Sequence, residues 1–318
     1  MVQIPQGQWT LPPEQRILRP EETSFDLQRV AKELTVIMST SVGDFTPSTD
    51  KVVAALESLQ SNVAFRWCRK ILVFDSVPSL EELDLLKRSN RRVYLEDIKG
   101  PKWEKMWNEK RQPYDEYCSV LRAMKEDNHP SLFNVELVFL QRFGHLLGGV
   151  RRALELVTTP YIFITQHDLR LSPRFVAADV QNILEVLHSD EARYVLLNRD
   201  VNSGMRTKAY FRLIHERSYR DDTKQPAGLS LTGMAGFSDQ SHFAQADWYR
   251  EEVLAAVPQE RQLTCMEHVL HQPWKEDETW RGTFLYGGRD DGPYTYDLIH
   301  GVQVYGPEGR LVGIQSMP

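Results

Sequence analysis

One short apolar segment that ends in an acid constrains the fold of this chain most. Residues 161–165 read Tyr-Ile-Phe-Ile-Thr, and a run so rich in β-branched and aromatic side chains predicts a buried strand. Gln166, His167 and Asp168 follow at once, and Ser172-Pro173 then predicts the start of a helix. Open α/β sheets bind ligands at the carboxyl ends of their strands. Asp168 is therefore expected at a ligand-binding edge, where an acid could hold a divalent cation.

Strand and helix signals alternate along the chain as far as residue 187. This alternation predicts a mostly parallel sheet covered by helices, and the pattern becomes irregular after residue 190. Residues 97–130 are expected to form a charged insertion, and residues 228–243 a glycine-rich loop. Strands are predicted at 34–38, 70–74, 93–95, 135–140, 161–165, 194–197, 210–214, 282–286 and 302–305, and helices at 49–59, 80–86, 146–157, 248–256 and 265–271.

Composition excludes several broad classes of protein. The 318 residues are 41% hydrophobic and 26% charged, which excludes global disorder, and a net charge of −6 gives no electrostatic preference for nucleic acid. The apolar runs fall well short of the ~20 residues that a membrane-spanning helix needs, and no secretory signal is visible. Three widely spaced cysteines indicate free thiols in a reducing compartment. We expect a cytoplasmic protein, or the soluble part of a larger or anchored one.

Two acids stand at predicted strand ends. Asp75 follows the strand at 70–74, and Asp168 follows the strand at 161–165. Carboxylates only accept hydrogen bonds, which suits them to ribose hydroxyls and base N–H groups. Aspartate also favours turns and helix caps, so each acid has a structural alternative. The two residues alone leave ligand binding and capping open.

The order of these parts resembles the GT-A glycosyltransferases, most closely the inverting family 2 type. Three segments carry the resemblance: the glycine-containing helix that starts at Gly144, the run Thr159-Pro160-Tyr161, and Asp168-Leu-Arg-Leu-Ser-Pro173. Where the family has Asp-x-Asp, this chain has Gln166-His167-Asp168, so only the second acid is kept. That acid is usually the direct metal ligand in the family, and the loss of the first leaves metal dependence open.

The resemblance implies a donor side in the first half of the chain. Asp75 would contact the nucleoside, and Asp168 with His300 would hold the donor diphosphate through Mn²⁺ or Mg²⁺. His300 matches a histidine that GT-A enzymes commonly place near the C-terminus. The remaining donor-side residues implied here are Ser39, Gln166, Arg151 and Arg152, of which the two arginines would compensate for basic positions that the family has nearby. Exposed charge on a helix is the ordinary alternative for them.

The resemblance also implies an acceptor side in the second half. Residues 236–251 resemble the acceptor region of algal and algal-virus glycosyltransferases of this group, which assigns Asp239 and His242 to the acceptor rim. The family's acid pair at a helix start appears as Glu267-His268, so Glu267 is the expected catalytic base and His268 its rival. A loop network for Asp239 and His242, and a first-turn helix acid for Glu267, are the structural alternatives.

The resemblance as a whole implies a single GT-A-like α/β domain with a mostly parallel central sheet flanked by helices and a smaller mixed sheet on the acceptor side. Residues 1–30 would form an arm, residues 31–190 the nucleotide-sugar-binding half and residues 191–318 the acceptor half. The implied activity is hexosyl or pentosyl transfer, with inversion, from a nucleotide-diphosphate donor to a hydroxyl acceptor such as a glycan. Phosphate-loop, Gly-x-Gly-x-x-Gly, His-Glu-x-x-His and Gly-x-Ser-x-Gly motifs are absent.

Two alternatives stay open beside this reading. A sugar-nucleotide pyrophosphorylase would carry a glycine-rich basic loop after the first strand, where this chain has Ser39-Thr40-Ser41-Val42-Gly43. A non-catalytic GT-A-like protein that binds sugar nucleotides or serves as a scaffold would also account for the missing first acid.

Overall fold

The computed structural model describes most of the chain from residue 27 onward. The described residues are 27–41, 48–79, 81–82, 101–199, 219–224, 229–234, 237–257, 266, 270, 282–288, 291–298, 302–305 and 311–315.

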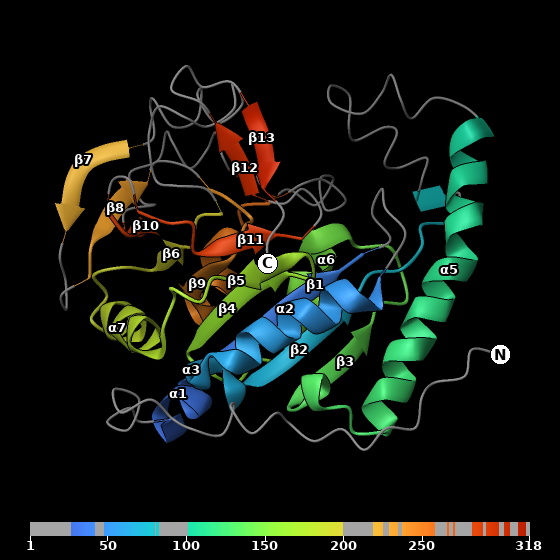
Figure 1. The fold of residues 1–318 in the computed structure, drawn as a ribbon, viewed down its shortest axis with the longest axis horizontal. Coiled ribbons are helices and arrows are strands. Elements are labelled where there is room, and N and C mark those ends of the chain that lie inside the picture. Colours follow the sequence, from blue (N-terminus) through green and yellow to red (C-terminus); the bar gives the residue numbers. More distant parts are fainter. Residues whose placement is uncertain are drawn as a thin grey trace.

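A nine-stranded sheet forms the centre of the molecule, with the strand order β3-β2-β1-β4-β9-β6-β10-β8-β7 (Figure 1). Strands β1 to β4 pair in parallel, and β6 pairs in parallel with β10. Within the described part of the sheet, β9 and β8 run in the opposite direction to the others. The strands are β1 Leu34–Thr40, β2 Arg69–Phe74, β3 Val135–Phe139, β4 Tyr161–Gln166, β6 Tyr194–Leu196, β7 Tyr219–Lys224, β8 Leu231–Met234, β9 His242–Gln245 and β10 Thr283–Tyr286.

Two small antiparallel ladders accompany the central sheet. One pairs β5 (Leu169–Leu171) with β11 (Thr295–Asp297), and the other pairs β12 (Val302–Tyr305) with β13 (Leu311–Gln315). The predicted α/β class, with a mostly parallel central sheet flanked by helices and a smaller second sheet, is confirmed. Most of the described strands of the second half extend the central sheet beyond β4.

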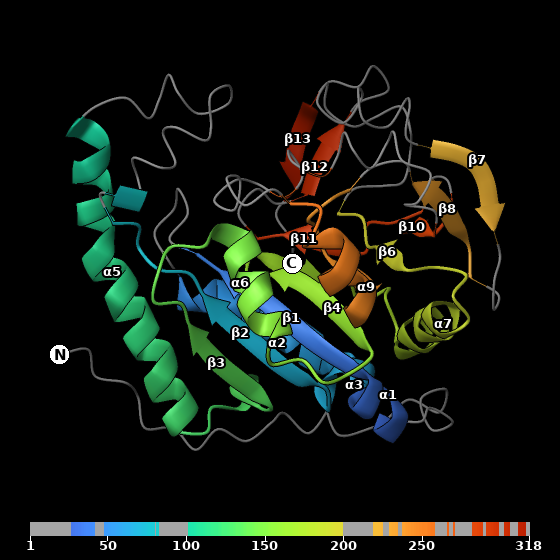
Figure 2. The same cartoon turned by 180° about the vertical axis from the view of Figure 1, so that it is seen from behind.

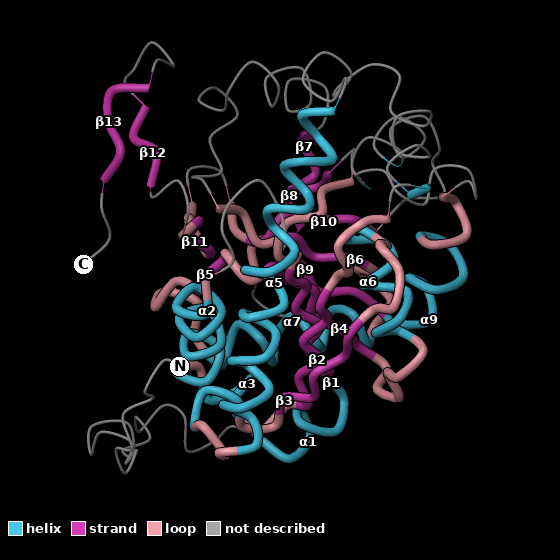
Figure 3. The backbone as a smooth tube through the Cα atoms, turned by 90° about the vertical axis from the view of Figure 1, so that its right-hand side faces the viewer, coloured by secondary structure: helices cyan, strands magenta, loops and turns pink. Residues whose placement is uncertain are grey.

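Helices cover both faces of the sheet, which Figure 3 shows nearly edge-on. Side chains from α1, α2, α3, α5 and α7 join one hydrophobic core, and Figure 1 looks onto that face. Side chains from α6 and α9 join the other core, on the face seen in Figure 2. The helices are α1 Leu27–Glu33, α2 Thr49–Ser61, α3 Val63–Arg66, α5 Pro101–Glu126, α6 His145–Leu154, α7 Ala177–His188 and α9 Ala246–Trp248, with a 3₁₀ turn at Pro130–Leu132 and a π-helical turn at Tyr249–Val253.

The central strands are apolar on both sides because both of their faces are covered. In β1, Val36 and Met38 join the core beneath α2, whereas Ile37 joins the core beneath α6. In β2, Leu72 and Ile71 divide between the two cores in the same way. Side chains alternate across a strand, so a strand with two buried faces reads as a continuous apolar run. This explains why the sequence predicted β1, β2 and β4 so directly.

Three regions differ from the sequence-based expectation. The charged segment 97–130 is mainly the long helix α5, and the predicted loop 228–243 contains β8 and the start of β9. Ser172-Pro173 does not begin a helix: Ser172 accepts a turn hydrogen bond from Phe175 N (3.0 Å), and α7 begins at Ala177. The predicted strands at 93–95 and 210–214 lie outside the described residues.

Two serines at helix starts differ in how they cap. Ser79 forms a reciprocal cap, since its Oγ accepts from Glu82 N (3.2 Å) and its N donates to the Glu82 carboxylate (2.7 Å). Ser48 stands at the N-cap of α2 without a side-chain cap bond. In the part of the chain that the structure describes, no helix has both the length and the apolar character needed to cross a membrane.

Candidate functional site

The carboxyl ends of β1, β2 and β4 bring the predicted donor-side residues of the first half together. Ser39 stands in register with both Val73 and Gln166. His167 N donates to Ser39 O at 3.0 Å, and Asp75 N donates to Thr40 O at 2.9 Å. Ser39, Asp75 and the Gln166–Asp168 segment therefore meet at one edge of the sheet.

Asp75 links the end of β2 to the start of α6. Its Oδ1 accepts hydrogen bonds from Ser76 N (2.9 Å) and Gly144 N (2.8 Å), and Gly144 is the N-cap of α6. Its Oδ2 is buried without a hydrogen-bond partner among the described residues. Burial raises the pKa of Asp75 to about 7, although the backbone donors oppose this. The capping alternative is thus correct for one oxygen, and the other oxygen retains unused capacity for a hydrogen bond.

Asp168 lies two residues beyond the end of β4 and is half buried. Its carbonyl accepts from Leu298 N (2.8 Å), and its Oδ1 is buried with no partner in the described part of the chain. Buried polar atoms in native proteins are nearly always paired, so an unpaired carboxylate oxygen calls for a water, an ion or a ligand. Leu298 stands two residues before His300, which itself lies outside the described residues.

His167 and Lys51 place further polar groups beside Asp168. Burial lowers the pKa of His167, the Asp168 carboxylate opposes this change, and the positive charge of Lys51 adds to it. Lys51 lies in the first turn of α2. The same helix packs against β5, where Leu171 N donates to Ser58 Oγ (3.0 Å). The sequence analysis missed Lys51. Its position in the first turn after a predicted parallel strand was the available signal.

The segment Ser238–Ser241 closes the same edge from the side of β9. Gln166 Nε2 donates to Asp239 O (3.2 Å), and the hydroxyls of Thr165 and Ser241 are 2.8 Å apart. Asp239 is half buried, and its carbonyl lies beside the end of β4. Asp239 and Gln166 are far apart in sequence, and the pairing of β4 with β9 brings them together.

His242 lies in the core instead of at the surface. Its ring is 1% exposed and stacks between Tyr194 (centroids 4.7 Å apart) and Tyr249 (5.6 Å). Burial lowers the pKa of His242 to about 4, so the imidazole is neutral at pH 7. A residue at the acceptor rim would need an exposed side chain. His242 instead points from β9 into the core, so this prediction is wrong.

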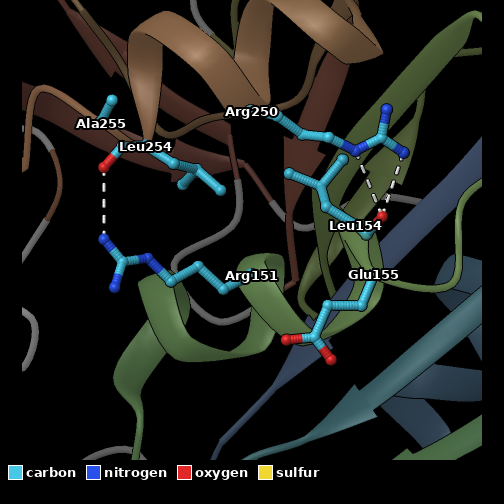
Figure 4. A pocket seen from close by; sticks show the side chains of 6 residues that line it. All are labelled: Arg151, Leu154, Glu155, Arg250, Leu254 and Ala255. Carbon is cyan, nitrogen blue, oxygen red and sulfur yellow. Dashed lines mark hydrogen bonds between the residues drawn. The ribbon is translucent and has the colours of Figure 1, made fainter.

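Arg151 and Arg152 do not reach the carboxyl edge. Both lie in the last turn of α6, which begins near Asp75 and runs back toward the start of β4. Arg151 Nη2 donates to Leu254 O (3.2 Å), and Arg152 forms an exposed ion pair with Glu155. Arg151 faces a groove of about 400 Å³ that also contains Arg250 (Figure 4). The expected donor role for these arginines therefore conflicts with the direction of α6.

The expected catalytic base and its rival are adjacent in sequence. Glu267 and His268 lie outside the described residues, while Met266 and Leu270, on either side of them, are helical and buried in the core beneath α6 and α9. The predicted helix at 265–271 agrees with these two positions.

The described donors fit a metal only in part. They include no cluster of three or more His, Cys, Asp or Glu side chains suited to a metal ion. Magnesium is often held by one or two carboxylates together with substrate phosphates and water. The unpaired Oδ1 of Asp168 fits one such ligand position. Asp168 is therefore the described residue that could hold a cation, with His300 as a predicted second ligand.

Comparisons with known proteins give no family. No family model and no curated protein matches the chain. Among solved structures, TarS residues 1–349 from S. aureus aligns with a TM-score of 0.42 at 10% identity, over 83% of this chain and 60% of that one. A mannosyltransferase from Pyrobaculum calidifontis, solved with GDP-Man and Mn²⁺, aligns with 0.41 at 11% identity, over 81% and 55%.

A third structure has another activity in its name. It is a cytidylyltransferase from Leptospira borgpetersenii, which aligns with a TM-score of 0.39 at 12% identity over 84% of this chain and 82% of its own. These three structures differ too much from the chain to indicate what it does. The proposal for its function therefore rests on the site geometry and the sequence motifs.

Proposed function

We propose that the chain is a GT-A-like glycosyltransferase that binds a nucleotide-diphosphate sugar at the carboxyl edge of β1, β2 and β4. One observation carries the proposal: two buried carboxylate oxygens, Asp75 Oδ2 and Asp168 Oδ1, stand at that edge without a partner among the described residues. Leaving such groups unpaired costs roughly 1–3 kcal/mol each, and a ligand that supplies donors or a cation would offset that cost.

Each donor-side residue has a role in this proposal. Asp75 Oδ2 would accept a hydrogen bond from the nucleoside, while Oδ1 stays on Gly144 N. Asp168, with His300, would hold Mn²⁺ or Mg²⁺, whose chemistry is to neutralise diphosphate charge. Lys51 adds a positive charge beside the same segment. Ser39 and Gln166 would line the floor between the two acids.

The chemistry requires a base on the acceptor side. Glu267 would take the proton from an acceptor hydroxyl, and the hydroxyl oxygen would form a bond to the sugar C1 as the bond from C1 to the diphosphate oxygen breaks. Attack from the face opposite the leaving group inverts the configuration. His268 remains the alternative base. A base of this kind contributes typically 10²–10⁴-fold to the rate.

Calorimetric titration with UDP-, GDP- and CMP-sugars, with and without Mn²⁺, tests donor binding. We expect one nucleotide class to bind to the wild type and to lose affinity in Asp168→Asn, while Asp127→Asn, an exposed acid beyond the end of α5, binds as the wild type does. Failure of every sugar nucleotide to bind would overturn the proposal.

A second assay separates transfer from binding. Glu267→Ala is expected to abolish transfer to a panel of glycosides while donor affinity stays unchanged, with Glu126→Ala, on the exposed end of α5, as the matched control. Transfer by Glu267→Ala at the wild-type rate would refute the assignment of the base. Binding by the wild type without transfer or donor hydrolysis would instead favour the non-catalytic alternative.

A further inference from the structure

The segment Ser238–Ser241 differs from an ordinary loop in how its backbone is held. Four successive carbonyls each accept a hydrogen bond from a residue in, or directly after, strand β4, β6 or β9. Tyr194 Oη donates to Ser238 O (2.6 Å), Gln166 Nε2 to Asp239 O (3.2 Å), His242 Nδ1 to Gln240 O (2.6 Å) and Leu197 N to Ser241 O (2.8 Å). Strands β4, β6 and β9 thus fix this segment residue by residue.

Two of these donors belong to one aromatic stack in the core. The rings of Tyr194, His242 and Tyr249 lie one above another, with interplanar angles of 29° and 11° between neighbours. All three side chains are at most 1% exposed. Phe237 meets the His242 ring edge-on at 6.1 Å. Such packing leaves the rings few alternative positions, so the donors that they carry are fixed as well.

The chemistry of His242 suits a structural donor. A neutral imidazole has one N–H, and the 2.6 Å contact with a carbonyl places that proton on Nδ1. Nε2 is buried without a partner in the described residues, which leaves no outward group for a substrate to meet. The π-helical turn at Tyr249–Val253 brings Tyr249 against the ring. Burial raises the pKa of Tyr249, and the Asp239 charge adds to this effect.

We propose that His242 and Tyr194 are positioning residues, which hold Ser238–Ser241 as a preorganised wall of the site and act on the reaction through Asp239. The predicted effect on rate rests on the glycosyl-transfer function proposed above, whereas the predicted effect on the backbone does not. His242 would then influence the acceptor side without contacting a sugar. Small displacements of a positioned group are costly in catalysis, since 1 Å can reduce a rate by ~10²-fold.

Hydrogen exchange tests the mechanical part without any substrate. In Tyr194→Phe, amides of residues 237–241 are expected to exchange at least ~10-fold faster, because one carbonyl contact is lost and local opening becomes easier. Tyr161→Phe is the matched control, since it removes a hydroxyl that is bonded to His188 at the other end of β4. Unchanged exchange at 237–241 in Tyr194→Phe would overturn the proposal, whether or not His242→Phe folds.

A double-mutant cycle tests the link to Asp239. With the sugar nucleotide that calorimetry selects, His242→Phe is expected to lower kcat by ~10-fold with little change in donor KM, and by less than ~2-fold in an Asp239→Asn background. Equal effects in both backgrounds would refute action through Asp239. If the wild type binds no sugar nucleotide, the proposed function fails, while the exchange result still decides whether the stack holds the segment.

Discussion

The cations at the amino edge of the central sheet and the acids at its carboxyl edge differ in how fully they are paired. At the amino edge, Arg250 donates to the carbonyls of Leu154 (3.0 Å) and Val157 (2.7 Å), and the buried Lys70 donates to Arg66 O (3.0 Å) and Cys68 O (3.1 Å). At the carboxyl edge, Asp75 and Asp168 each keep a buried oxygen with no partner among the described residues.

This difference in pairing distinguishes charges that stabilise the fold from charges that are available to a ligand. The groove at the amino edge contains Arg151 and Arg250, and by charge alone it would suit an anionic ligand (Figure 4). Both arginines are already bonded to backbone carbonyls. We therefore base the proposed ligand site on the unpaired oxygens of Asp75 and Asp168 rather than on net positive charge.

The largest predicted effect comes from neutralising Asp168, which tests whether this acid serves the reaction or the fold. Asp168→Asn keeps the shape of the side chain and removes its charge, so we expect transfer to fall by about 10²–10³-fold, the range seen when a key electrostatic group is lost. Thermal unfolding should stay within a few degrees of the wild type, because Asp168 Oδ1 has no hydrogen-bond partner to lose among the described residues. A large loss of stability with normal transfer would show that Asp168 is structural.

The raised pKa of Asp75 predicts a pH-dependent contribution to the stability of the fold. Its folded pKa of about 7 exceeds the unfolded value of 3.8, so the folded state holds a proton that the unfolded state has released. This contribution to stability is therefore present below about pH 4 and is lost as the pH rises to about 7.

Asp75→Asn removes this titration. Between pH 5 and pH 8, its unfolding free energy should improve relative to the wild type by about 2–3 kcal/mol, as measured by urea unfolding at the two pH values. Asp127→Asn should follow the wild-type pH dependence. Parallel curves for the wild type and Asp75→Asn would contradict a buried, proton-holding acid at this edge.

Arg250 tests the opposite edge. Arg250→Ala should cost about 2 kcal/mol of unfolding free energy, because hydrogen bonds from a charged donor to two carbonyls are lost. The control Arg152→Ala removes only an exposed pair with Glu155 and should cost less than ~1 kcal/mol. Donor affinity should be unchanged in both variants. Weaker sugar-nucleotide binding in Arg250→Ala would move the site to the groove.

The smallest expected effect concerns the link between α5 and the carboxyl edge. Tyr114 Oη donates to the backbone carbonyl of Asp75 (2.6 Å), and Tyr117 Oη lies 2.8 Å from Thr40 Oγ1. Tyr114→Phe should lower the unfolding free energy by about 1 kcal/mol, as urea unfolding would measure. An effect below ~0.3 kcal/mol would show that the Tyr114 hydrogen bond does not help to hold α5 at this edge.

The sequence was informative where physical patterns are local. Strands with two buried faces are continuous apolar runs, so β1, β2 and β4 and the acids at their ends could be predicted. Their convergence followed from parallel pairing. The position of Asp239 beside Gln166 depended on β9, an antiparallel strand that a glycine-rich stretch concealed.

Orientation was beyond what the patterns could give. His242 and Asp239 are three residues apart, but His242 is buried in the core, whereas Asp239 is half buried and its carbonyl lies beside the end of β4. Arg151 and Arg152 were assigned to the donor side because the resemblance implied that they compensate for basic positions nearby, yet the axis of α6 carries them toward the amino edge. Charge could be read from the sequence, whereas the partners that neutralise it could not.

A crystal structure of the chain with its best-binding nucleoside diphosphate tests the central claim most directly. The account predicts the diphosphate beside Asp168 and the nucleoside against Asp75, at the carboxyl edge of β1, β2 and β4. A ligand bound between Arg151 and Arg250, with the carboxyl edge vacant, would contradict it.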